Sequence, residues 1–219
     1  MAEAMRQTVA DMLKGIERYN PENLTTLEKY VEIQARENAY DLEANLAVLK
    51  LYQLNPQRYN VDITSQILLK ALTNLPHTDF VLCKCLLSEK IMSEEPVNHI
   101  MYLGDILEQC DFQHFWERVR SMSNLYDNIV GFQDSIRKFV CHVVGITFQT
   151  IDKPLLSQLL GDIDDNMLGN WINKYGWQEQ NRGGKKFIFI ANQDENIKTK
   201  NITEKIDFEN VAGLMAACL

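Results

Sequence analysis

The sequence predicts a mainly α-helical protein that ends in a small α+β module. Three observations lead to this prediction. Apolar residues recur at three- and four-residue spacing over most of the first two thirds of the chain. Proline, asparagine and aspartate interrupt these stretches at short intervals, as helix starts and stops do. Residues 147–190 then read as two short helices followed by two strands around a glycine turn, which is the order of a winged helix-turn-helix.

Three helices are predicted in the first quarter of the chain. The first carries an apolar stripe from Met5 and ends near Tyr19. Asn20-Pro21-Glu22 starts the second, because asparagine caps helices and proline suits a first helical position. The third covers Asp41 to Leu54, and its apolar residues extend around more than one stripe. Neighbouring helices should therefore cover the third helix from both sides, as in a stacked solenoid.

Five more helices are predicted before the module. They begin at capping or proline positions, which are Asp62, Thr78 or Asp79, Pro96, Asp111 and a last start after Gly131. Residues 121–131 have the weakest pattern and are predicted to form a loop or a frayed turn. No fixed repeat length is visible, so we expect an irregular α-solenoid or helical bundle.

The C-terminal module contains its own start and stop signals. Pro154 opens its first helix and Gly161 ends it, while Asp164 can cap the second helix. Trp177 opens the wing. Asn181 to Gly184 supplies glycines for a tight turn, and Lys185 to Ile190 forms the returning strand.

The returning strand is apolar on both faces. Phe187 and Phe189 point to one side, and Ile188 and Ile190 point to the other, because side chains alternate along a strand. A strand of a small wing normally exposes one polar face to water. We therefore expect these four residues to lie at or near a sheet edge that a partner protein covers or extends.

The charge of the chain favours a protein partner over a nucleic acid. The formal net charge is −8, and the second helix of the module begins with three aspartates, Asp162, Asp164 and Asp165. These carboxylates would repel phosphate at the position where a DNA-reading helix enters a groove. The rival hypothesis is a winged-helix RNA-binding subunit, and a weak RNA contact would use four cations, Lys174, Arg182, Lys185 and Lys186.

The C-terminal tail is predicted to be a polar linker followed by one more short helix. Val211, Leu214 and Met215 lie on one side of that helix. A single helix this short is marginal in water. We expect it to pack on the body of the protein or to join the helix of a partner.

No motif in the sequence points to catalysis, a metal or a cofactor. The five cysteines are irregularly spaced and lack a CxxC or HExxH context, and no glycine-rich phosphate loop is present. An enzyme that uses Cys141 as nucleophile is a remaining alternative, although its neighbour His142 would face away from it on a helix. The N-terminus does not resemble a signal peptide and no long apolar run occurs, so we expect a cytoplasmic protein without a membrane span.

Five long segments resemble the family of K subunits of eukaryotic translation initiation factor 3, which are PCI-type subunits. These segments are residues 37–56, 67–86, 104–116, 137–152 and 197–211. The resemblance implies a HEAT-like helical-repeat domain at 1–130, a winged-helix domain with its lead-in helix at 131–192, and a linker and C-terminal helix at 193–219.

The same resemblance implies a function. It implies a non-catalytic scaffold that supports assembly of the preinitiation complex on the small ribosomal subunit through protein–protein contacts. The expected partners are other subunits of the factor, with subunit L as the immediate neighbour, and no cofactor is expected. A PCI scaffold subunit of the proteasome lid or the signalosome would share this architecture and remains an alternative.

Overall fold

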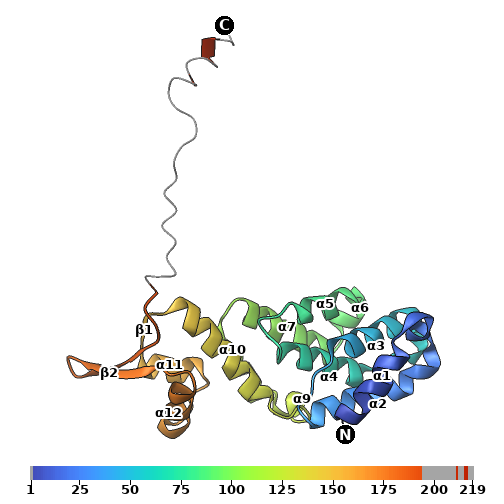
Figure 1. The fold of residues 1–219 in the computed structure, drawn as a ribbon, viewed down its shortest axis with the longest axis horizontal. Helices are drawn as coiled ribbons and strands as arrows, with labels where there is room; N and C mark the ends of the chain where they lie inside the picture. The colour runs from blue at the N-terminus through green and yellow to red at the C-terminus, as the bar shows by residue number, and fades with distance from the viewer. Residues whose placement is uncertain (1, 194–210, 212–214, 217–219) are drawn as a thin grey trace.

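The computed structural model describes residues 2–193, 211 and 215–216, and it consists mainly of helices with one small sheet (Figure 1). The helices of the first part are α1 Ala2–Met12, α2 Leu24–Arg36, α3 Leu42–Leu54, α4 Val61–Leu72, α5 Asp79–Cys85, α6 Glu89–Ser93, α7 Val97–Glu108, α8 Phe112–Ser121 and α9 Ser123–Tyr126. Short 3-10 turns, Gly15–Tyr19, Pro21–Asn23 and Pro56–Arg58, connect the early helices. The long helix α10, Phe132–Thr147, then leads to the sheet, and Figure 1 shows it between the two parts.

Side-chain caps explain where several of these helices begin. The carboxylates of Asp41 and Asp111 accept hydrogen bonds from the backbone N–H groups of Ala44 and His114. Of these two caps, the sequence predicts the one at Asp111. Helix α4 differs from the prediction. The side chain of Asn60, two residues before the predicted cap Asp62, accepts from two backbone N–H groups and starts the helix.

The core of the helical part is centred on α4. Helices α2, α5 and α7 all contact it, and its residues 67–69, 71 and 72 are at most 1% exposed. The predicted covering of α3 from several sides is confirmed, since α2, α4 and α5 pack around it. A buried hydrogen bond of 2.9 Å from the amide of Gln34 to Asn45 joins α2 to α3 within this core.

Two predicted details of the helical part were wrong. The first helix ends at Met12 and not near Tyr19, which leaves the side chain of Ile16 82% exposed on a 3-10 turn. Helix α6 was missed, although Ser88 caps it. The loop or frayed turn predicted at 121–131 contains the single helical turn α9.

The C-terminal unit combines two helices with a three-stranded antiparallel sheet. Its elements are β1 Thr150–Asp152, α11 Lys153–Leu159, α12 Asp165–Lys174, β2 Gln178–Arg182 and β3 Lys185–Phe189. The predicted tight turn is confirmed, because Gly183 and Gly184 have φ values of +59° and +80° and join β2 to β3. The predicted cap of α12 is also confirmed, since Asp164 accepts from the backbone N–H of Met167 at 2.8 Å.

The predicted position of Phe187, Ile188, Phe189 and Ile190 at a sheet edge was wrong. The strand order is β1-β3-β2, so β3 pairs on both sides and lies in the centre of the sheet. Strand β1, which is three residues long and directly precedes α11, was not predicted. Among the described strands, β1 and β2 form the edges of this sheet.

Candidate protein-interaction surface

One face of β3 belongs to the core of the chain itself. Ile188 lies opposite Ile151 of β1, and the two side chains are 0% and 2% exposed. Ile190 is 8% exposed, and its backbone N–H continues the ladder by donating to the carbonyl of Gln149. Helix α11 packs against β1 and β3. Ile188 and Ile190 are therefore unable to contact a partner in this conformation, and their proposed role is corrected.

The other face of β3 presents a pair of aromatic side chains. Phe187 and Phe189 are half-buried and point away from the core, in keeping with the alternation along a strand. Their cross-strand neighbours are all polar: Asp152, Gln180, Thr150 and Gln178. An aromatic centre within a polar ring is the usual composition of a protein–protein contact. We call Phe187, Phe189 and these four neighbours the sheet surface.

An ion-pair cluster fixes the helices to the sheet. The ammonium group of Lys153 lies 2.5 Å from a carboxylate oxygen of Glu179 on β2 and 3.6 Å from Asp165 on α12. The hydrogen bond to Glu179 raises the pKa of Lys153, and the same bond lowers the pKa of Glu179. The lysine side chain is only 17% exposed, so its charge is used within the fold.

The four cations of the RNA-binding hypothesis come from two places, the end of α12 and the β2–β3 hairpin. Lys185 and Lys186 are exposed beside a cleft of about 690 Å³, but Asp152 and Asp165 line the same cleft. Lys174 lies 4.5 Å above the ring of Trp171 at the end of α12. Arg182 ends β2, and its side chain lies outside the described part of the chain.

The acidic residues that argue against phosphate binding have structural partners. Asp164 is used as the cap of α12, and Asp165 faces Lys153. Asp162 lies 2.5 Å from the guanidinium group of Arg120 on α8. These carboxylates therefore organise the C-terminal unit and its contact with the helical part.

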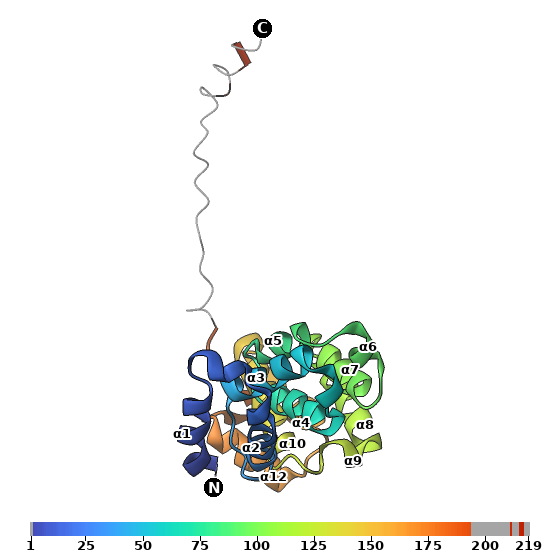
Figure 2. The same ribbon diagram turned by 90° about the vertical axis from the view of Figure 1, so that its right-hand side faces the viewer.

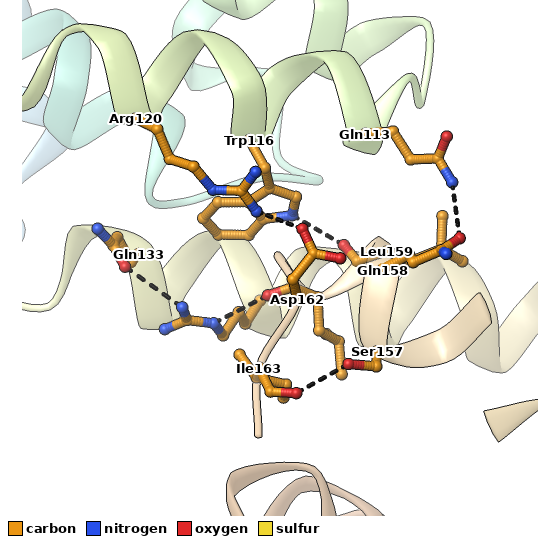
Figure 3. A network of polar contacts seen from close by, with 11 residues as sticks. Gln113, Trp116, Arg120, Gln133, Ser157, Gln158, Leu159, Asp162 and Ile163 are labelled. Atoms are coloured by element: carbon orange, nitrogen blue, oxygen red, sulfur yellow. Dashed lines mark hydrogen bonds and ion pairs between the residues drawn. The ribbon is translucent and has the colours of Figure 1, made fainter. Parts of the chain in front are cut away.

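A joint between α8 and the end of α11 connects the two parts of the molecule (Figure 3). The indole N–H of Trp116 donates to the carbonyl of Leu159 at 2.8 Å, and Gln113 donates to Gln158 at 3.3 Å. With the Arg120–Asp162 ion pair, these contacts line up along one side of α8, as Figure 3 shows. Gly161 has a φ of +94°, and a Cβ placed there would lie 2.8 Å from the Trp116 ring.

Arg137 of α10 completes the joint from the opposite side. Its guanidinium group donates to the carbonyl of Leu160 at 3.1 Å and lies 5.2 Å from the centre of the Trp116 ring. Asp134 holds the same group at 2.9 Å. This joint was not predicted, because only the folded chain brings residues 116, 137 and 161 together. The positive charge of Arg137 within an apolar stripe is the single signal that could have indicated it.

The proposed contact residues of the C-terminal helix are only partly described. Val211 and Met215 are helical, with side chains that are 37% and 68% exposed. Leu214 lies outside the described residues. The exposed apolar side chains at 211 and 215 are available to a partner.

The described residues contain no grouping of three side chains that could hold a metal ion, and no helix among them is long and apolar enough to span a membrane. Burial raises the pKa of the Cys141 thiol to about 12. That thiol is therefore protonated at neutral pH and is a poor nucleophile.

Comparison with known proteins identifies the group to which the chain is related. The model of the CSN8/PSMD8/EIF3K family matches residues 58–201. The chain belongs to this family. The match includes most of the helical part, the joint and the entire sheet.

Relatives that match over nearly their full length identify the chain more specifically than the family model does. A protein of Bombyx mori named eukaryotic translation initiation factor 3 subunit K is 66% identical, over 99% of this chain and 97% of its own length. A protein with the same name from Aedes aegypti is 61% identical, over 100% of this chain and 97% of its own length. The one from Homo sapiens is 58% identical, over 99% of this chain and 98% of its own length. The resemblance to the K subunits of initiation factor 3 is confirmed, and with it the function of a translation initiation factor 3 subunit.

Proposed function

We propose that the chain is a non-catalytic scaffold of initiation factor 3 that acts in the cytoplasm. In this role it supports assembly of the preinitiation complex on the small ribosomal subunit, with subunit L as its immediate neighbour. We further propose the division into a HEAT-like domain at 1–130, a winged-helix domain at 131–192 and a terminal segment at 193–219. The break at Gly131, which has a φ of +76° just before α10, supports the first boundary.

The observation that best supports a scaffold is the sheet surface. The described chain buries Ile188 on one face of its central strand but leaves Phe187 and Phe189 partly exposed on the other. Half-exposed aromatic side chains within a polar ring contribute strongly to binding, because a partner can remove their remaining apolar surface from water. The exposed side chains of Val211 and Met215 supply a second proposed contact, to which Leu214 would add.

The sheet surface can be tested by replacing Phe189 with aspartate. Phe189→Asp should weaken the capture of subunit L by about tenfold or more, since a charge would be buried without a partner at the centre of the contact. The fold should be retained, because the side chain already faces partly outward. Capture would be measured by co-purification of the two full-length subunits, and folding by circular dichroism and thermal unfolding.

Two further variants make this test specific. Ile16→Asp is the matched control, because it places the same charge on an 82% exposed apolar residue of the first 3-10 turn and should leave capture unchanged. Ile188→Asp should unfold the C-terminal unit, since Ile188 is 0% exposed. A folded Phe189→Asp protein that captures subunit L as well as the unmodified chain does would refute the role of the sheet surface.

The terminal helix requires a separate experiment. Met215→Asp and Leu214→Asp should weaken the same capture without lowering the thermal stability of the chain, because the helix would be stabilised by the partner. A loss of stability in the isolated subunit would instead indicate that this helix packs on its own body, and it would exclude the proposed intersubunit contact.

A further inference from the structure

A groove crosses the helical part at a distance from the sheet surface. Its volume is about 720 Å³, within the range of sites that hold short peptides and small ligands. Helix α4 forms the floor, and α2, the start of α7 and residues 121–129 form the walls. Figure 2 shows α4 between α2 and α7, with α9 at the lower right. The segment with the weakest helical pattern thus forms one wall.

The charges that line this groove are mainly negative. Its titratable side chains are Glu32, Asp62 and His99, and no lysine or arginine belongs to the lining. Within the described part of the chain, the carboxylates of Glu32 and Asp62 have no ion-pair partner. His99 lies 3.5 Å from Glu95 just outside the groove, and Arg36 binds the backbone carbonyl of Glu32 rather than its carboxylate.

The groove also contains an acceptor that lacks a donor. The side-chain oxygen of Gln66 on α4 is shielded from solvent, and no described group donates to it. An acceptor in this state costs free energy until it receives a hydrogen bond, so a donor in the groove would recover that cost. Asn124 and Asn128 add exposed amide groups along the opposite wall.

We propose that this groove binds an extended segment of a partner protein that carries lysine or arginine. The backbone N–H groups of such a segment can donate hydrogen bonds to the acceptors of the groove, and its cations can form ion pairs with the carboxylates of Glu32 and Asp62. A polyanion such as RNA is excluded by the same charges. The site lies on the helical part, so it extends the proposed scaffold function and does not depend on the sheet surface or on subunit L.

The test measures binding of a fluorescein-labelled peptide with the sequence GKSRGKSR to the full chain at physiological salt. The double variant Glu32→Gln, Asp62→Asn should bind this peptide about tenfold more weakly, because two nearby charges are removed. The control Glu89→Gln, Glu108→Gln removes the same net charge from exposed residues outside the groove and should change the affinity less than about twofold. Gln66→Leu should also weaken binding, since it deletes the unpaired acceptor.

Hydrogen exchange of the chain with and without the peptide shows which residues the peptide covers. Protection on peptide addition should appear in residues 121–129 and at the start of α4. Equal weakening in both double variants would mean attraction by net charge alone and would overturn the proposal. The absence of peptide binding to the unmodified chain, or binding of an RNA oligonucleotide that the groove variant abolishes, would overturn it as well.

Discussion

At the scale of single residues, Lys70 is the least expected side chain of the core. It is 1% exposed on α4, and its ammonium group has one described contact, 3.4 Å from the side-chain oxygen of Asn38. Burial lowers the pKa of Lys70 to about 8, because the charged form loses its hydration. The residue therefore weakens the fold at neutral pH, and no part of the proposed function requires it.

Replacing Lys70 with methionine should raise the free energy of unfolding at pH 7 by roughly 3 kcal/mol, in proportion to the pKa depression. Below about pH 8 the variant should keep its full gain in the free energy of unfolding over the unmodified chain. This gain should shrink toward pH 10.5, because there the unfolded chain still binds a proton that the folded chain has released. Urea unfolding at several pH values would measure this, with Lys29→Met on the exposed face of α2 as the control. An advantage that is independent of pH would contradict the assignment.

At the scale of elements, the starts of helices follow side-chain chemistry that spans only a few residues. Asp111 and Asp164 cap their helices as the sequence predicts, because each carboxylate reaches a backbone N–H in the first turn. The prediction for α4 was wrong because Asn60 and Asp62 are both good capping residues. Nothing local decides between two candidates that are two positions apart.

Asn60→Ala should lower the stability of the chain by about 1 kcal/mol, since Asn60 accepts from the N–H groups of both Asp62 and Ile63. Asp62→Ala should cost only a few tenths of a kcal/mol, through the loss of a favourable charge in the first helical turn. Chemical denaturation of the two variants side by side gives the comparison. The reverse order of effects would show that Asp62 is the true cap.

At the scale of the whole molecule, the joint holds the C-terminal unit with its sheet against the helical part. Trp116 and Arg137 form hydrogen bonds to the end of α11 whose partners are 43 and 23 residues apart in the sequence, and the guanidinium group of Arg137 stacks on the Trp116 ring. Gly161 is required at its centre for two reasons. Its φ of +94° disfavours other residues, and the Trp116 ring occupies the space that a Cβ would need.

Gly161→Ala should destabilise the chain by several kcal/mol, because backbone strain adds to a clash with the indole ring. Gly176 offers a matched control, since its φ of +68° is also positive but nothing lies within 4 Å of an added Cβ. Gly176→Ala should therefore cost only about 1–2 kcal/mol. Thermal unfolding of both variants measures the difference, and equal losses would show that the joint tolerates the methyl group.

The sequence alone determined the helical class, most helix starts, the glycine turn and the family, because these depend on local periodicity, capping and long segments of recognisable residues. Tertiary structure alone decided the position of β3. The third strand β1 has no pattern of its own and forms only when its backbone pairs with β3, which moves Phe187 to Ile190 from the predicted edge to the centre. The joint and the acidic groove likewise exist only after distant segments meet. Backbone pairing and side-chain packing across such distances leave no periodic signal in the sequence, which is the physical reason for this division.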